Sequence, residues 1–362
     1  MSNQDNKESG HSPALASATR LKAESEATAY CLCILVALVF CISACIHGSR
    51  RYRIEETARF DTPGWAHDVA LADNKIYVSD RQAGLLVFRR DQGLTSPQVF
   101  TPVADVISLA PRVDGLLLAA RFEGLVQIAP DGAVLGRLAF ENEIANYVST
   151  RGDLAFVAFG LHGLVVAQPG KDGIRQIAGL ASPGWSHDVK LWREHALLAD
   201  WNYGLRIVDI RAPEKPVEIA VVPTPATAIA LALGNSPDGR PMTAVAEGHG
   251  GVSLVDLSDP AQPRVIARHS LGLNPRDRAH PESGGWAHGV AWSGRYVFVA
   301  NWKRGLTVLD VDDLQKPRIA VEYHTSGTAL GVQAESAPDG SITVFLADGE
   351  AGLLLLRLTI DD

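Results

Sequence analysis

The chain has 362 residues, of which 46% are hydrophobic and 20% charged, and its formal net charge is −8 with an isoelectric point near 5.8. This composition is typical of globular proteins and excludes a disordered or low-complexity chain. A negative charge argues against a nucleic-acid partner, since such binders usually present a basic face. All four cysteines lie between residues 31 and 45. The rest of the chain therefore contains neither a disulfide scaffold nor a thiolate site.

The amino terminus has the features of a leader followed by a membrane segment. Residues 1–28 are polar and lack a hydrophobic pattern, and we expect them to be disordered. Residues 29–46 carry no charge and match the shortest spanning helix or a long signal-peptide core. At the end of this segment Ile42-Ser43-Ala44-Cys45 resembles the lipobox of bacterial lipoproteins, which implies that Cys45 is lipidated and becomes the first residue.

Two other interpretations of the segment stay open. Glu24 and Glu26 precede the core, whereas export signals favour positive charge there. Arginines between residues 50 and 53 follow it, and the positive-inside rule would then keep the body of an uncleaved, helix-anchored protein in the cytoplasm. A buried core helix is the third interpretation. We favour a lipid-anchored protein of the bacterial cell envelope, with its body periplasmic or surface-exposed.

Beyond residue 50 one unit recurs seven times. Each unit contains four short β-like runs, and a glycine followed by an aliphatic residue opens the third run. Four strands in about 40–45 residues is the period of a β-propeller blade. The repeat glycines, spaced 39 to 54 residues apart, are Gly84, Gly124, Gly163, Gly204, Gly251, Gly305 and Gly352.

The two ends of the repeat region favour a closed ring. After Gly352 the chain supplies one more strand, LLLLRLTI, so the last unit lacks its outer strand. Residues 53–62 resemble the fourth strands of other units, such as PVEIAVVPT. Because a closed ring protects sheet edges, we predict an all-β, seven-bladed β-propeller over residues 50–362. Its blades are four-stranded, and the amino-terminal strand completes the seventh.

Three units suggest a known family. The segments GLRIVDIRAPEKP, GVSLVDLSDPAQP and GLTVLDVDDLQKP resemble the LVIVD repeat, which occurs in predicted β-propellers of bacterial and archaeal surface proteins. The resemblance covers residues 64–356 and is strongest in the fourth to sixth units. It implies a propeller fold and a surface location, and it supplies no catalytic residues.

The first, fourth and sixth units share a Gly-Trp-x-His run. Each histidine stands 17 residues before its repeat glycine and 13 residues before an Asp or Asn. In a propeller both positions belong to loops on one face, so we expect them at one mouth of the central channel. The histidines are His67, His187 and His288, the partners are Asp80, Asp200 and Asn301, and the other units carry Asp105, Asn146, Thr227 and Leu330 at the aligned histidine position.

These residue types suit several kinds of site. Converging neutral imidazoles suit a divalent transition metal, with carboxylates orienting the rings, and a His–Asp pair suits general-base chemistry. Arg81 and Arg121 in neighbouring loops suit an anion. Indole rings suit the floor of a pocket for a sugar or a flat apolar ligand; the candidates are Trp65, Trp185, Trp286, Trp201 and Trp302.

The same residues also have purely structural interpretations. Asp or Asn before a turn glycine commonly closes an Asx turn, tryptophan can cover a blade edge, and a rim histidine can simply be hydrogen-bonded. We predict a membrane-tethered module that binds or scaffolds a protein or small molecule through its loop-rich mouth. The alternative is an enzyme with a histidine-based site there, with or without a metal, because propellers host unrelated activities.

Overall fold

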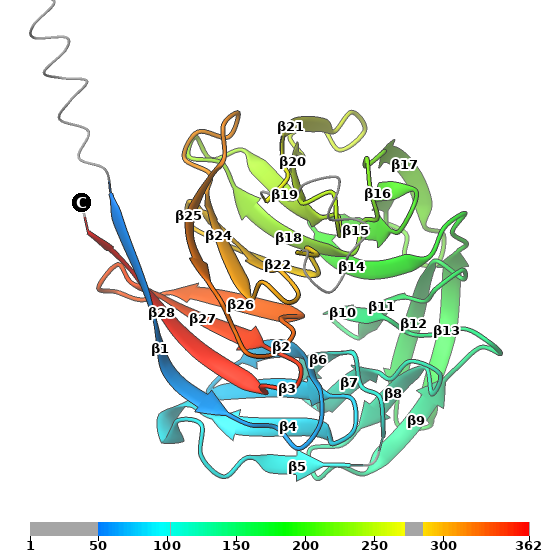
Figure 1. Ribbon diagram of the computed structural model, residues 1–362. Coiled ribbons are helices and arrows are strands. Elements are labelled where there is room, and N and C mark those ends of the chain that lie inside the picture. Colours follow the sequence, from blue (N-terminus) through cyan, green and yellow to red (C-terminus); the bar gives the residue numbers. More distant parts are fainter. Residues whose placement is uncertain (1–49, 102, 272–284, 362) are drawn as a thin grey trace, which may run out of the picture. The chain divides into compact units, whose positions relative to one another are not determined.

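The computed structural model describes residues 50–101, 103–271 and 285–361. These residues form seven four-stranded sheets arranged in a ring (Figure 1). The predicted all-β, seven-bladed propeller with four-stranded blades is therefore confirmed. The leader, residues 29–46 and the lipobox-like Cys45 lie outside the described residues. Within the ranges given above, no helix is long and apolar enough to cross a membrane.

Six blades take their four strands consecutively, from the channel outward, with antiparallel pairing. Blade 1 contains β2 (Ala66–Ala72), β3 (Lys75–Asp80), β4 (Gly84–Arg89) and β5 (Gln98–Phe100), and blade 2 contains β6 (Ser108–Arg112), β7 (Gly115–Ala119), β8 (Leu125–Ile128) and β9 (Val134–Leu138). Blade 3 contains β10 (Tyr147–Arg151), β11 (Leu154–Ala158), β12 (Leu164–Gly170) and β13 (Gly173–Leu180), and blade 4 contains β14 (Ser186–Trp192), β15 (His195–Asp200), β16 (Gly204–Asp209) and β17 (Val217–Val222). Blade 5 contains β18 (Ala230–Asn235), β19 (Pro241–Ala246), β20 (Val252–Asp256) and β21 (Arg264–His269), and blade 6 contains β22 (Gly289–Ser293), β23 (Tyr296–Ala300), β24 (Leu306–Asp310) and β25 (Arg318–Tyr323). A short 3-10 helix, η1 (Arg90–Gln92), follows β4.

Blade 7 combines the two ends of the repeat region. Its sheet has the order β1-β28-β27-β26, in which β26 (Gly331–Ser336), β27 (Ile342–Ala347) and β28 (Leu353–Asp361) come from the carboxyl end. The outermost strand is β1 (Arg51–Phe60), drawn in blue beside the red β28 (Figure 1). The predicted closing strand is therefore present. The Tyr52 hydroxyl donates to Asp310 Oδ2 of blade 6 at 2.7 Å, which ties β1 to the neighbouring blade as well.

The hydrophobic core lies between successive blades. The two middle strands of each blade are buried on both faces, which explains their continuous apolar runs such as KIYVSD and ITVFLA. Between blades 6 and 7, Phe298 and Val308 pack with Val344 and Leu356, all fully buried. The outer strands alternate instead; β9, for example, is half-buried and exposed at successive positions.

The innermost strands surround the centre of the ring (Figure 1) and contact one another in sequence, with β26 contacting β2. Each has one edge without a strand partner, so its backbone groups need other hydrogen-bond partners. Side chains from the preceding blade supply them: Ser149 Oγ donates to Val189 O at 2.7 Å, and Asn146 Nδ2 donates to Ser186 O at 2.9 Å. The channel edge of the fold is thus held by side chains that reach from blade to blade.

Candidate functional site

The three histidines from the first, fourth and sixth units converge in the channel. His67 and His187 lie at the start of β2 and β14, and His288 immediately precedes β22. The imidazole centroids of His67 and His288 are 5.4 Å apart, and those of His187 and His288 are 6.2 Å apart. Both pairs meet edge to face. Residues 221 positions apart in sequence are thereby neighbours, as the repeat spacing predicted.

One residue from each blade occupies the level of the histidines. Two of the aligned positions expected from the sequence are wrong, because the second and fifth blades contribute Ile107 and Ile229 in place of Asp105 and Thr227. The amide of Ile229 donates to Ala246 O across its blade at 2.8 Å, as that of His288 donates to Ala300 O at 2.9 Å. The complete ring is His67, Ile107, Asn146, His187, Ile229, His288 and Leu330, all of which line one cavity.

Hydrogen bonds fix the tautomer of the imidazoles. His67 Nδ1 lies 3.2 Å from Ile107 O, and His288 Nδ1 lies 3.0 Å from Leu330 O. His187 makes the corresponding bond to the backbone of Ile229. Because a carbonyl oxygen only accepts, Nδ1 carries the proton in each ring and Nε2 is left as a bare acceptor. Among the described residues, no hydrogen bond to these Nε2 atoms is formed.

The channel keeps the three imidazoles uncharged. Burial lowers the pKa of each, and for His187 the pKa falls to about 4. The neighbouring rings lower the pKa of His67 further, and Arg81 acts in the same direction. At neutral pH the site therefore presents neutral hydrogen-bond acceptors.

A cavity of about 350 Å³ lies at the mouth, above the histidine level. It contains three indoles, each close to an imidazole: the ring centroids of His187 and Trp201 are 6.2 Å apart, and those of His249 and Trp286 are 4.5 Å apart. We call it the mouth cavity. Its lining residues are His187, Trp201, Thr227, Ile229, His249, Trp286, His288 and Trp302.

The two other candidate tryptophans have a packing role. A Cβ built on Gly349 would lie 3.1 Å from Cε2 of Trp65, and one on Gly160 would lie 3.4 Å from Cζ2 of Trp185. Each indole thus covers a glycine in the loop of the preceding blade. Neither Trp65 nor Trp185 lines the mouth cavity. Their structural interpretation, packing between blades, describes their contacts best.

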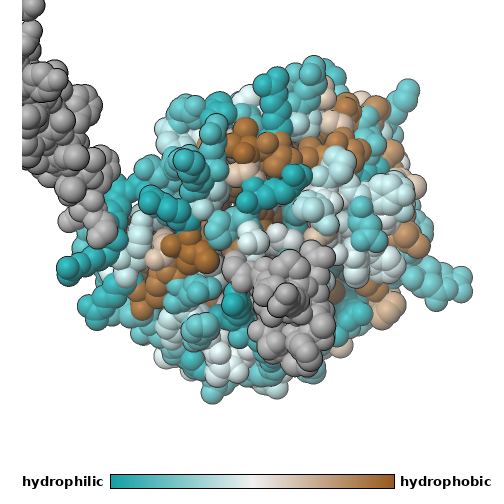
Figure 2. Space-filling model, turned by 45° about the horizontal axis from the view of Figure 1, so that its top comes forward, coloured by the Kyte–Doolittle hydropathy of each residue, from teal (hydrophilic) through white to brown (hydrophobic). Residues whose placement is uncertain are grey.

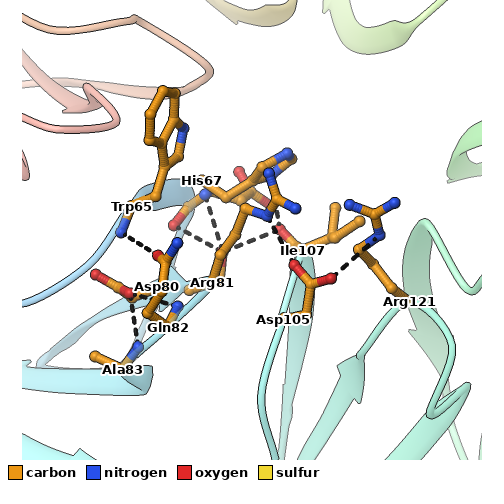
Figure 3. A network of polar contacts seen from close by, with 11 residues as sticks. Trp65, His67, Asp80, Arg81, Gln82, Ala83, Asp105, Ile107 and Arg121 are labelled. Atoms are coloured by element: carbon orange, nitrogen blue, oxygen red, sulfur yellow. Dashed lines mark hydrogen bonds and ion pairs between the residues drawn. The ribbon is translucent and has the colours of Figure 1, made fainter.

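The Asp and Asn partners of the histidines brace loops. Asp80 accepts hydrogen bonds from the amides of Gly64, Gln82 and Ala83 at 2.8–3.0 Å (Figure 3). Its counterpart in blade 6, Asn301, donates from Nδ2 to Thr307 Oγ1 at 3.1 Å. Neither of these two side chains is exposed or lines the mouth cavity, so neither is available to a ligand there.

Asp200, the third partner, makes a buried ion pair. Arg206 Nη1 lies 3.1 Å from Asp200 Oδ2, and Arg206 Nε donates to Glu218 at 2.5 Å. The Asp200 carboxylate is fully buried and the Arg206 side chain is 4% exposed. Asp200 therefore also has a structural role, one that a loop-closing position in the sequence does not distinguish from a binding role.

The two candidate anion-binding arginines share one carboxylate. Arg81 Nε lies 2.7 Å from Asp105 Oδ1, and Arg121 Nε lies 3.3 Å from Asp105 Oδ2 (Figure 3). Asp105 neutralises one of the two guanidinium groups, so one positive charge remains on this side of the mouth. Asp105 belongs to this rim pair and not to the histidine ring with which the repeat alignment had grouped it.

Below the histidines, the channel contains a second, polar cavity of about 300 Å³ that sequence reasoning missed. We call it the channel cavity. Its charged residues are Asp68, Asp188 and Lys190, and Tyr147 faces them. The signal was present, because the aspartates directly follow His67 and His187 in the sequence. The mouth cavity and the channel cavity share three lining residues, which are His187, Ile229 and His288.

The rim around the mouth is partly apolar. Phe122, Leu161 and Tyr203, on the loops between the second and third strands of blades 2 to 4, are 65%, 52% and 46% exposed. In the view of Figure 2, patches of apolar side chains interrupt a mostly hydrophilic surface. Among the residues that the structure describes, no group of three or more His, Cys, Asp or Glu side chains is arranged to hold a metal ion.

Together these features define a seven-bladed β-propeller with an indole- and imidazole-lined mouth. The LVIVD repeat model matches residues 63–88, 183–224 and 284–325. These are the first, fourth and sixth units, the same three that carry the Gly-Trp-x-His run, so the resemblance is confirmed for them. The fifth unit, expected among the strongest, lies outside the matched regions, whereas the first lies inside.

Solved structures share the fold at low identity. A structure titled U3-55K has a TM-score of 0.64 at 12% identity and covers 85% of this chain and 98% of its own. The β-propeller domain of Cps50 (Swd1) from Myceliophteria thermophila has a TM-score of 0.65 at 13% identity, with coverages of 84% and 99%. At such identities the likeness concerns the fold alone. No curated protein sequence matches this chain.

Proposed function

We propose that this protein is a binding module whose mouth cavity takes a ligand with a flat apolar group and hydrogen-bond donors. The observation that carries the proposal is the pairing of three indoles with neutral imidazoles in one cavity. Indole faces favour flat apolar groups, and bare Nε2 atoms accept hydrogen bonds from hydroxyl or amino groups. A small molecule, or a side chain of a protein partner, meets these requirements.

The electrostatics favour binding over general-base catalysis. An imidazole whose pKa is about 4, as for His187, is a weak base at neutral pH, and proton transfer is most efficient when the pKa lies near the working pH. The enzyme alternative therefore depends on a metal at the three histidines. It predicts stoichiometric metal in the purified full chain, lost when His67, His187 and His288 are all replaced by alanine.

The proposal includes a tether to the bacterial cell envelope. It rests on the uncharged residues 29–46 and the lipobox-like sequence that ends at Cys45. In this arrangement the propeller is held at a membrane surface, periplasmic or surface-exposed, and presents its mouth to ligands.

Binding is tested with phenylbutanol, a neutral probe that combines a flat ring with a hydroxyl donor. Tryptophan fluorescence of the full chain is titrated for the wild type and for Trp302→Ala. We expect the replacement to weaken binding about fivefold or more, because an aromatic contact of ~1 kcal/mol is lost.

The matched control is Trp65→Ala. Trp65 belongs to the same repeat motif as Trp286, but it covers Gly349 and does not line the mouth cavity. We expect it to lower stability and leave the affinity for phenylbutanol unchanged. Equal losses of affinity in both variants, or no binding by the wild type, would refute the proposed function.

A further inference from the structure

The channel cavity holds an imbalance of charge. Among the described residues that line it, two carboxylates, Asp68 and Asp188, face a single cation, Lys190. The histidines above are neutral because burial lowers their pKa. With both carboxylates ionised, the cavity therefore carries one uncompensated negative charge.

Lys190 is already engaged. Its Nζ lies 3.5 Å from Asp188 Oδ1 and 3.8 Å from the centroid of the Tyr147 ring. These contacts place the ammonium beside Asp188 and over an aromatic face. Asp188 Oδ2 additionally accepts the amide of Leu231 in the next blade at 2.7 Å.

Asp68 is the less compensated carboxylate. It accepts the amide of Val69 at 2.9 Å and interacts with the Tyr147 hydroxyl, and among the described residues no Lys or Arg lies within 4.0 Å of it. Asp188 Oδ1, in a residue that is 2% exposed, has no hydrogen-bond partner in the described structure. A buried carboxylate without full compensation costs free energy, and a bound cation removes that cost.

We infer that the channel cavity is an ammonium site and that the ligand of the mouth is an aryl-alkyl amine. The inference rests on the proposed function. The flat ring lies among the indoles of the mouth cavity, and the alkyl chain passes the imidazoles. The ammonium donates to Asp68, which lies one residue, about 3.3 Å along the strand, beyond His67. The two cavities are joined by His187 and His288, which line both.

The donor and acceptor inventory selects this ligand class. The groups that face Asp68 and the space above it are the Nε2 atoms of the histidines, the Asp188 carboxylate and the Tyr147 hydroxyl, with Lys190 as the charged donor. An anionic ligand group would meet two carboxylates, and a purely apolar one would leave them unpaired. An ammonium group satisfies the acceptors and closes the charge balance.

The test compares three probes that share a phenyl ring and an alkyl chain and differ in their charged or polar end: phenylbutylamine, phenylbutanol and phenylbutyrate, each titrated into the full chain by calorimetry. For the wild type we expect the amine to bind at least about tenfold more tightly than the alcohol, because a hydrogen bond to a charged group is added. Phenylbutyrate is expected to bind more weakly than the alcohol. In Asp68→Asn the amine is expected to bind no more tightly than the alcohol.

Asp312→Asn is the control, since Asp312 has a 56% exposed side chain and lies outside the channel cavity; it should keep the preference for the amine. Equal binding of amine and alcohol by the wild type, or an unchanged preference in Asp68→Asn, would overturn the ammonium site and leave the mouth proposal standing. Absence of binding by all three probes would overturn both. Thermal unfolding of each variant shows that it is folded.

Discussion

The indole of Trp286 lies directly over Gly248 in the loop of the preceding blade. Gly248 has φ +52°, and a Cβ built on it would lie 2.9 Å from Cζ2 of Trp286. At the matching loop position of blades 4 and 6 the chain has Trp201 and Trp302, with φ +27° and +51°. A large side chain thus comes either from the arriving inner strand or from the loop itself, and a glycine is needed where it comes from the strand.

Replacing Gly248 with alanine should therefore cost stability for two reasons. The left-handed backbone disfavours an L side chain by about 1–2 kcal/mol, and the contact with Trp286 adds about 1–3 kcal/mol of overpacking. Gly152→Ala supplies the matched control, because Gly152 has φ +57° and a Cβ built on it would meet no atom within 4 Å. Urea denaturation of both variants isolates the contact; equal losses would mean that Trp286 moves away without cost.

Arg206 offers a second test of how the mouth loops are held. Arg206→Ala leaves the buried Asp200 carboxylate without its ion-pair partner, and we expect a loss of about 3 kcal/mol or more. Arg211→Ala removes an exposed pair with Asp209 and should change stability by only about 0.5 kcal/mol or less. Denaturant unfolding measures both. A small loss for Arg206→Ala would show that the loop of blade 4 does not depend on this pair.

The pH dependence of Asp68→Asn tests the environment of the channel cavity. Burial raises the pKa of Asp68 to about 7 from 3.8, so the folded wild type binds more protons than the unfolded chain between these values. The wild type therefore loses stability as the pH rises through this window, whereas the variant has no such group to titrate. We expect the stability of Asp68→Asn relative to the wild type to increase by about 2–3 kcal/mol from pH 5 to pH 8.

The other groups around Asp68 titrate in both proteins, so they largely cancel in this comparison. They are His67, Tyr147, Asp188 and Lys190. The depressed pKa of the imidazoles acts in the opposite direction, since it removes stability as the pH falls below about 6.5. A relative stability that does not change with pH would contradict the raised pKa of Asp68.

The tether is tested by metabolic labelling with palmitate in a bacterial host. We expect the wild-type chain to be labelled and Cys45→Ala to remain unlabelled and uncleaved. Cys41→Ala is the control, since Cys41 lies inside the apolar segment and outside the lipobox-like sequence. A wild type that is membrane-bound without label would favour the uncleaved helical anchor.

The architecture was predictable because it depends on a repeating local signal. Each blade needs a turn glycine before its third strand, and several of these, such as Gly204 at φ +88°, adopt a backbone that favours glycine. Their spacing gave the number of blades. The unpaired last unit and the similarity of residues 53–62 to the fourth strands gave the closing strand.

The register at the mouth was harder to predict. β-bulges after Ala66 and Ser186 and a longer hairpin in blade 5 shift the local residue count, which is why Asp105 and Thr227 were aligned with histidines in place of Ile107 and Ile229. The channel cavity was missed for another reason. Inner strands are partly buried on both sides, so alternation does not show that Asp68 and Lys190 line the channel.

The central claim is that neutral imidazoles from distant units present bare Nε2 atoms to one ligand cavity. Nitrogen-15 NMR of the histidine-labelled full chain tests it most directly. At pH 7 we expect His67, His187 and His288 to be neutral with the proton on Nδ1, and we expect the Nε2 signals of His187 and His288 to shift when phenylbutylamine is added. The signal of the exposed His324 should stay unchanged. A protonated ring, a proton on Nε2 in any of the three, or Nε2 signals that do not respond to saturating probe would contradict the account.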